Sequence, residues 1–163
     1  MSEEIKKGLL GIVVDETTIS HVVPELSALT YRGYKVQDLC DKCDFEEVAF
    51  LVLHGELPSK KQLKKFIKEE RSNRKLSKTI NKNIQQMPKN SHPMDVIRTC
   101  VSLMALEDKD TKDNSPKANM KKAVRIYSQT PTAIAAYCRA RKRKKIISPS
   151  KKLSFSDNFF KMM

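Results

Sequence analysis

The feature that most constrains the fold is a series of helix start and stop signals that begins at residue 44. Asp44 and Glu47 form a capping pair ahead of FEEVAFLVLHGELP, a segment so apolar that the helix should be buried. Gly55 favours the end of that helix. Ser59 and Gln62 form a second capping box before a helix with a narrow apolar stripe. These signals predict a chain built mostly of helices.

The later segments continue the helical spacing. Pro93 suits a first helical position, and His92 before it can serve as the cap. Apolar residues then recur at helical intervals in two stripes, Ile97, Cys100, Val101 and Met104, and Met120, Ala123, Val124 and Tyr127. An acidic loop, EDKDTKDNSP, separates the two stripes. Thr130 and Pro131 should end the second helix and begin another, with Thr130 as its cap.

Only the first part of the chain favours strands. GLLGIVVDETTISHVV, residues 8–23, is rich in β-branched residues, and ALTYRGYKV is a second candidate strand in which Gly33 marks a turn. These two segments could pair as a small sheet. We therefore predict a mainly α fold, with a β element and a short helix over residues 1–43 and a helical segment over residues 44–163.

The last ten residues, SFSDNFFKMM, raise a separate question. Ser154 can cap a helix there, and the Asp157 side chain can bond to the backbone N–H of Ser154, as in a capping box. The apolar side chains share one helical face: Phe155, Phe159, Met162 and Met163. So short a helix is marginal alone in water because nucleation is costly. Two alternatives follow: the helix docks onto the preceding helices, or the chain is cut in the middle of a fold.

Composition narrows the class of protein. The chain has 163 residues, enough for one domain, and no run of ~18 apolar residues that would indicate a membrane span. The N-terminal MSEEIKKGLL lacks the apolar core of a signal peptide. We therefore expect a cytoplasmic protein with no membrane partner.

The net charge of +13 is unevenly distributed. Residues 1–58 carry 5 basic and 11 acidic side chains, whereas residues 59–163 carry 27 and 8. The run RARKRKK, residues 139–145, can be interpreted as a nucleic-acid or localisation patch. It can equally be a solvated helix end, where cations complement the helix dipole. Because no stacked aromatics or nucleic-acid module lie nearby, nucleic acid is not the expected partner.

The sequence offers no convincing active site. Cys40 and Cys43 have the spacing of half a zinc site, but Cys100 and Cys138 lie too far apart to complete it, so we expect small, partly buried thiols. The histidines, His21, His54 and His92, have no ligand partners at metal-binding spacing, and we expect His54 to be a satisfied core residue. There is no phosphate loop and no GxSxG motif. We predict no catalytic, cofactor-binding or metal-binding residue.

Six segments occur in an order that resembles a known family. They are GLLGIVVDETTIS, LTYRGYKVQDL, FEEVAFLVLHGELP, HPMDVIRT, PTAIAAY and LSFSDNFFKMM. Together they resemble the N-terminal part of citrate synthase or 2-methylcitrate synthase of the short bacterial and archaeal type, from about residue 8 to the last residue. The resemblance implies that the catalytic histidines, the catalytic aspartate and the CoA-binding segments of the family have no counterpart here. His21, His54 and His92 match family positions that we interpret as structural.

The family reaction condenses acetyl-CoA with oxaloacetate, and the citryl thioester is then hydrolysed to citrate and CoA. The resemblance implies that this segment supplies scaffold helices and dimer surface, binds no cofactor itself and is inactive alone. Its expected partner is a second copy or a separately encoded C-terminal half. The chain would then be a truncated gene product, half of a split gene or a deliberately shortened piece. The alternatives are a stand-alone helical interaction module and a basic nucleic-acid-binding protein.

Overall fold

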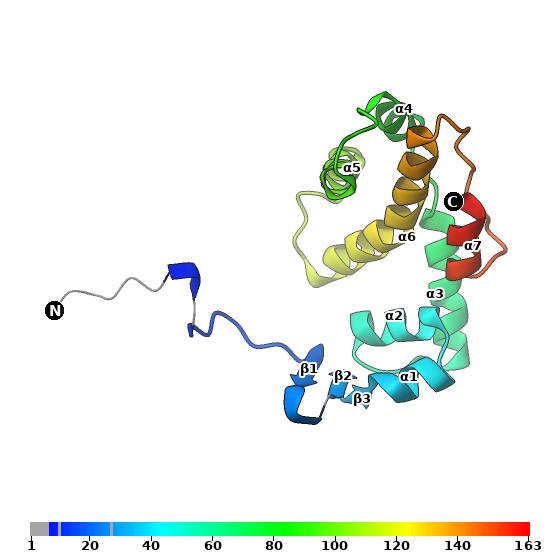
Figure 1. The fold of residues 1–163 in the computed structure, drawn as a ribbon. Helices are drawn as coiled ribbons and strands as arrows, with labels where there is room; N and C mark the ends of the chain where they lie inside the picture. Colours follow the sequence, from blue (N-terminus) through cyan, green and yellow to red (C-terminus); the bar gives the residue numbers. More distant parts are fainter. Residues whose placement is uncertain (1–6, 10, 27) are drawn as a thin grey trace.

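The computed structural model describes residues 7–9, 11–26 and 28–163, and α-helices dominate these residues (Figure 1). The first part holds the short helices η1 (Lys7–Leu9) and η2 (Pro24–Leu26) and the strands β1 (Ser20–Val23), β2 (Ala28–Tyr31) and β3 (Tyr34–Lys35). The α-helices are α1 (Val36–Lys42), α2 (Phe45–His54), α3 (Lys60–Asn73), α4 (Lys78–Gln86), α5 (Pro93–Glu107), α6 (Pro116–Arg141) and α7 (Phe155–Met162). The predicted class, mainly α with a small N-terminal β element, is confirmed. The division of the chain after residue 43 remains a prediction.

The three strands form one antiparallel sheet in the order β1-β2-β3. Arg32 and Gly33 join β2 to β3 and have φ angles of 50° and 86°, as a two-residue hairpin turn with positive φ at both positions requires. The first strand starts at Ser20, so the extended structure predicted from residue 8 is only partly a strand. Residues 12–17 are exposed and have no strand assignment, because the sheet provides no partner for them.

The helix boundaries follow the local signals. The backbone N–H of Asp44 donates to Glu47 Oε2 at 2.8 Å, and the N–H of Ser59 donates to Gln62 Oε1 at 2.9 Å, as expected for the two capping boxes. Gly55 ends α2 with a φ of 96°. His92 Nδ1 accepts from the Met94 N–H at 3.2 Å, so the predicted cap of α5 is confirmed.

The prediction of a helix break at Thr130 and Pro131 is wrong, because α6 continues through both residues to Arg141. A proline inside a helix removes one backbone hydrogen bond and costs roughly 3 kcal/mol. Buried residues on both sides of it, from Val124 to Ala140, hold the helix against its neighbours. Tertiary packing therefore outweighs the local break. Figure 1 shows that α6 changes direction along its length.

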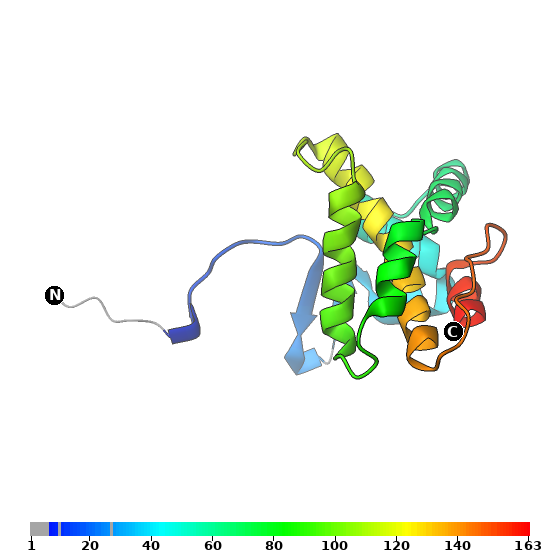
Figure 2. The same cartoon turned by 90° about the horizontal axis from the view of Figure 1, so that it is seen from above.

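Helix α6 passes through both hydrophobic clusters of the described residues. One cluster joins α4, α5 and α6: Leu76, Ile80, Ile84, Val96, Cys100, Met104, Ala133, Ala136, Tyr137 and Ala140. The other joins α2, α3 and α6 through Phe50, Phe66 and Val124. Seen from two directions, α6 lies among the remaining helices (Figures 1 and 2). This long helix is therefore the axis around which the body is assembled.

Helix α7 docks onto the body. This is one of the two alternatives that the sequence left open for the last ten residues. Met162 is 1% exposed and Asn158 is 3% exposed, while Phe155 and Phe159 on the same face are half-buried. The carboxylate of Glu46 accepts the Phe155 N–H at 2.8 Å. A residue 109 positions away thus satisfies one of the free donors at the helix start.

Candidate functional site

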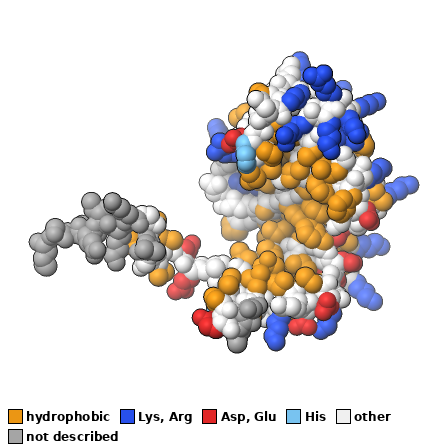
Figure 3. Space-filling model, in the orientation of Figure 1, with side chains coloured by type: hydrophobic (Ala, Val, Ile, Leu, Met, Phe, Trp, Pro, Cys, Tyr) orange, Lys and Arg blue, Asp and Glu red, His pale blue; other side chains and the backbone are white. Residues whose placement is uncertain are grey.

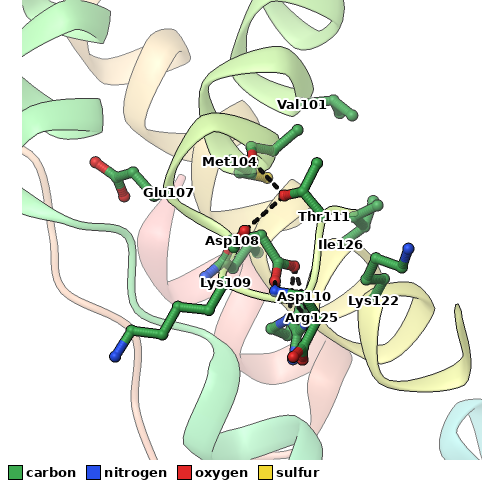
Figure 4. Close-up of a pocket in the computed structure, with 12 residues that line it drawn as sticks. Val101, Met104, Glu107, Asp108, Lys109, Asp110, Thr111, Lys122, Arg125 and Ile126 are labelled. Atoms are coloured by element: carbon green, nitrogen blue, oxygen red, sulfur yellow. Dashed lines mark hydrogen bonds and ion pairs between the residues drawn. The ribbon is translucent and has the colours of Figure 1, made fainter. Parts of the chain in front are cut away.

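A well-defined hollow lies where α5 ends, beside the following loop and the first half of α6 (Figure 4). Its volume is about 420 Å³, within the range of small-molecule pockets. One wall is apolar and comprises Val101, Met104, Ala105 and Ile126, and the charged lining comprises Glu107, Asp108, Lys109, Asp110, Lys122 and Arg125. We refer to this hollow as the α5–α6 cavity.

An ion-pair cluster organises the α5–α6 cavity. Arg125 donates from Nε to Asp108 Oδ2 at 2.9 Å, and from Nη2 to Asp108 Oδ1 at 2.8 Å and to Asp110 Oδ2 at 3.0 Å (Figure 4). Burial raises the pKa of Asp108, but the Asp110 N–H and the Arg125 guanidinium more than offset burial, so the net pKa is lowered. Thr111 Oγ1 lies 2.7 Å from the Ala105 carbonyl oxygen and 2.6 Å from that of Asp108.

This arrangement favours binding over catalysis. A carboxylate that is held ionised by a bidentate arginine is a weak proton acceptor, and an arginine shared by two carboxylates has little charge left for a substrate. Across residues 7–9, 11–26 and 28–163, no group of three His, Cys, Asp or Glu side chains could hold a metal ion. The α5–α6 cavity therefore combines an apolar wall with a charged lining of three carboxylates and three cations, in which Arg125 is bound to Asp108 and Asp110.

A second polar cluster lies under the C-terminal segment and was not identified from sequence. Glu70 and Arg74 form a bidentate pair with two contacts of 2.7 Å, and the side chains are 0% and 2% exposed. Arg74 Nη1 also donates to the carbonyl oxygens of Ser150 at 2.8 Å and Leu153 at 3.0 Å. Burial raises the pKa of Glu70 even though Arg74 opposes it. The i,i+4 spacing of the pair is the signal that could have found it.

The three histidines occupy three different elements, β1, the end of α2 and the cap of α5. His54 is exposed, and its ring stacks on Phe50 at a centroid distance of 4.1 Å. Partial burial of the ring lowers the pKa of His54, and the negative charge of Glu69 opposes this shift. The expectation of a core histidine is therefore wrong.

The cysteines are all free thiols, with Cys40 exposed, Cys43 and Cys138 half-buried and Cys100 buried. Burial raises the pKa of Cys43, and the nearby carboxylates of Glu47 and Asp44 add to the shift. Burial also raises the pKa of Cys100. Raised pKa values keep these two thiols protonated, which is the opposite of what a nucleophile or a metal ligand requires.

The basic run 139–145 is partly used inside the protein. Arg139 donates to the Lys145 carbonyl oxygen at 2.6 Å, and Arg141 donates to that of Lys89 at 3.1 Å. The guanidinium of Arg141 also lies 5.8 Å from the ring centre of Tyr137. Residues 142–145 remain exposed. Figure 3 shows Lys and Arg side chains gathered over α4 and the end of α6.

A further apolar surface runs along α5 and α6. A shallow hollow of about 30 Å³ lies between the two helices, and its lining includes Ile97, Cys100, Ile134 and Cys138. The α5 residues of this hollow and those of the apolar cavity wall follow one another at helical spacing. One face of α5 is therefore apolar from residue 93 to residue 105. Figure 3 shows hydrophobic side chains gathered over α6 and α2. We call the residues lining the shallow hollow the α5–α6 face.

Comparison with known proteins finds one family. A family-level sequence model described as "Citrate synthase, C-terminal domain" matches residues 8–163. The chain is 44% identical to the citrate synthase of Mycolicibacterium smegmatis, covering 97% of this chain and 42% of that protein. It is 45% identical to the 2-methylcitrate synthase of Mycobacterium tuberculosis H37Rv, covering 98% of this chain and 40% of that protein. The chain therefore spans about two fifths of the length of these relatives.

Solved structures give the same result. The crystal structure of citrate synthase from Thermotoga maritima superposes with a TM-score of 0.83 at 34% identity, covering 98% of this chain and 41% of that one. Citrate synthase from Pyrobaculum aerophilum superposes with a TM-score of 0.90 at 26% identity, covering 96% and 41%. Among the residues that the structure describes, no helix is long and apolar enough to cross a membrane.

Proposed function

This chain belongs to the citrate synthase family, and from that premise we propose that it supplies scaffold helices and subunit surface to a citrate synthase-like assembly and does not carry out the condensation alone. The partner in this proposal is a second copy of the chain or a separately encoded segment of the kind that completes the longer relatives. Acetyl-CoA is the proposed substrate of the assembly and not a ligand of this chain. A cytoplasmic location remains a prediction.

The observation that carries the scaffold role is the α5–α6 face. Ile97 and Ile134 lie half-buried on it, and Met94 is 61% exposed at the start of the same helix. Contiguous apolar surface on two paired helices is typical of a protein interface. Because the chain spans only about two fifths of its relatives, further protein that could cover this face exists in those relatives.

The carboxylates of the α5–α6 cavity are poorly suited to acid–base chemistry, which supports the second half of the proposal. The condensation requires a base that removes a proton from the acetyl methyl group and cations that stabilise developing negative charge. Asp108 and Asp110 are already bound to Arg125, and the lowered pKa of Asp108 makes it a poorer base. His54 stacks on Phe50 at the end of α2 and is not among the residues that line the α5–α6 cavity.

A direct assay tests whether the chain works alone. The purified chain is incubated with acetyl-CoA and oxaloacetate, and free CoA is measured with a thiol reagent. We expect no release above the rate without oxaloacetate. Release that depends on oxaloacetate would contradict the proposal, and a fall in that release when Asp108 is changed to Asn would place a working base in the α5–α6 cavity.

The alternative of nucleic-acid binding has one supporting observation, the exposed lysines and arginine at residues 142–145. It makes a different prediction, since binding driven by phosphate contacts weakens steeply with salt. Titration of the chain with random duplex DNA at two salt concentrations separates this alternative from the scaffold role.

A further inference from the structure

Another hollow lies where the start of α7 meets α2 and α3. Its volume is about 330 Å³, at the lower end of the range of small-molecule pockets. Three separate segments line it, and the lining includes Phe45 and Glu46 of α2, Leu63, Ile67 and Arg71 of α3, and Ser154 at the start of α7. Figure 1 shows α7 beside α3 and next to α2. We call this space the α7 hollow.

Glu46 brings a buried carboxylate to the α7 hollow. The residue is 6% exposed, and its Oε1 accepts the Phe155 N–H at 2.8 Å. An ionised carboxylate has about four acceptor sites, so this bond leaves capacity for a second donor. None of the ion pairs among the described residues includes Glu46. Asp44 lines the same hollow and adds a second negative charge, so a cationic donor group on a ligand would be held there.

Arg71 brings a cation to the same hollow. Its Nε is buried and has no hydrogen-bond partner among the described residues, and none of their ion pairs includes this guanidinium. Arg74, further along the chain, differs because it binds Glu70 through two contacts of 2.7 Å. The N–H groups of a guanidinium form a fork that fits a carboxylate. The group that Arg71 lacks is therefore a carboxylate.

The rest of the α7 hollow is apolar enough to hold a hydrocarbon side chain. Leu63 and Ile67 are half-buried on α3, and Phe45, which is 52% exposed, lines the hollow from α2. An ammonium group, a carboxylate and an apolar side chain on one carbon atom make an α-amino acid. We propose that the α7 hollow binds a free amino acid with a branched or aromatic side chain. Its ammonium group lies on Glu46, its carboxylate lies on Arg71, and its side chain packs on the apolar wall.

The bound amino acid joins segments that are far apart in the sequence. Glu46 and Arg71 belong to α2 and α3, whereas Ser154 and Ser156 belong to the C-terminal segment. The hollow is complete only while α7 is docked, so the ligand binds the docked state and stabilises it by mass action. This inference goes beyond the scaffold role and does not depend on it, because the purified chain contains every residue involved.

A series of ligands tests each part of the proposal on the purified chain. L-leucine carries all three groups, isoamylamine lacks the carboxylate, isocaproate lacks the ammonium group, and glycine lacks the apolar side chain. Each missing group removes one contact, so we expect the dissociation constant from isothermal titration calorimetry to be about tenfold or more higher than for leucine. Leucine that neither gives a binding heat nor raises the melting temperature at millimolar concentration would overturn the proposal. Isoamylamine or isocaproate that binds as tightly as leucine would overturn it as well.

Two variants assign the ligand groups to their partners. Arg71→Gln removes the partner of the carboxylate, so leucine and isoamylamine should bind this variant alike. Glu46→Gln keeps an oxygen for the Phe155 N–H but loses its charge, so leucine and isocaproate should bind this variant alike. Leucine should bind each variant about tenfold or more weakly than it binds the unchanged chain.

Lys68→Gln is the matched control. Lys68 is exposed on α3 and is not among the residues that line the α7 hollow, and its loss changes the net charge as Arg71→Gln does. It should leave the affinity for leucine unchanged. Circular dichroism checks that each variant is folded, and the ligand series on the unchanged chain decides the proposal if a variant is not. Equal binding of leucine to Arg71→Gln and to the unchanged chain, or equal weakening by Lys68→Gln and Arg71→Gln, would overturn the proposal.

Discussion

Arg74 connects more separate parts of the chain than its position at the end of α3 suggests. It binds Glu70, two carbonyl oxygens in residues 150–153 and, through its own carbonyl oxygen, the Thr132 hydroxyl at 2.8 Å. Removing one member of a buried ion pair leaves the other charge uncompensated. Arg74→Met should therefore lower the free energy of unfolding by about 3–5 kcal/mol, as measured by urea denaturation.

An exposed ion pair provides the control. Arg98 and Asp95 are bonded at 3.0 Å on α5, but the side chains are 80% and 61% exposed. Arg98→Met should change the free energy of unfolding by less than about 1 kcal/mol, because water screens such pairs. Equal effects of the two substitutions would show that burial of the Arg74 pair is not what makes it important.

The Tyr127 hydroxyl is buried like the Arg74 side chain, but it has no hydrogen-bond partner among the described residues. Its ring stacks on Phe155 at 4.7 Å, and burial followed by the charges of Glu70 and Glu46 raises the pKa of the hydroxyl. Removing an unsatisfied buried hydroxyl relieves a desolvation cost, so Tyr127→Phe should stabilise the protein by about 1 kcal/mol. Thermal and urea unfolding measure the difference.

Tyr137 is the matched control for that prediction. Its hydroxyl lies 2.9 Å from the Pro88 carbonyl oxygen and 3.2 Å from that of Ser91. Tyr137→Phe loses this bond and should destabilise the protein by about 0.5–1.5 kcal/mol. If both substitutions destabilise to the same extent, the Tyr127 hydroxyl has a partner.

His54 should make stability depend on pH near neutrality. Its pKa is lowered in the folded state, so the unfolded chain binds a proton more readily. The contribution of His54 is therefore complete above the ordinary pKa of 6.5 and is lost as the pH falls toward the lower, folded value. His54→Phe keeps a ring on Phe50 and should lose less stability on acidification from about pH 7.5 to about pH 5.5 than the unchanged chain. Parallel pH profiles would contradict the assignment.

At the scale of elements, α6 is the helix on which both hydrophobic clusters depend, and it contains Pro131. Pro131→Ala restores a backbone donor inside the helix and should stabilise the protein by roughly 1–3 kcal/mol. Pro116→Ala is the control, since Pro116 lies at the start of the same helix, where no intrahelical partner is lost. Destabilisation by Pro131→Ala would show that the packing requires the bend in α6.

The difference between α6 and its prediction shows which parts of the fold were accessible from sequence. Helix starts such as Asp44 and Ser59 depend on bonds between residues three apart, so a local pattern suffices to locate them. The continuity of α6 through Pro131 depends on packing against α4 and α5, which no local pattern contains. The N-terminal strand was placed too early for a similar reason, because β propensity does not say whether a partner strand exists.

The candidate site was less accessible than the fold. The sequence indicated an acidic loop at residues 107–116, but Arg125, which binds Asp108 and Asp110, comes from α6, 15 and 17 residues away. The α5–α6 cavity exists only because the end of α5 and the loop after it lie beside the first half of α6. The apolar stripe that includes Ile97 was visible in the sequence, whereas the half-buried state of Ile97 on an open face was not.

At the scale of the whole molecule, two surfaces of the described residues are not covered by other described parts of the chain. One is the α5–α6 face, and the other is the exposed segment at residues 11–19. The α5–α6 face is mainly apolar, whereas residues 11–19 combine apolar side chains with the acidic Asp15 and Glu16. Both surfaces support the proposal that the chain associates with further protein.

Capture of a complementary segment tests this account most directly. The chain, carrying an affinity tag, is co-expressed with the part of the Mycolicibacterium smegmatis citrate synthase that it does not match, and the yield of the complex is measured after purification. The account predicts a stable complex for the unchanged chain and for the control Phe160→Ser, which removes a 75% exposed ring on α7, and loss of the complex for Ile97→Asp with Ile134→Asp. The account would be contradicted if the unchanged chain failed to capture the segment. It would also be contradicted if the variant with Ile97→Asp and Ile134→Asp captured the segment as well as the unchanged chain does.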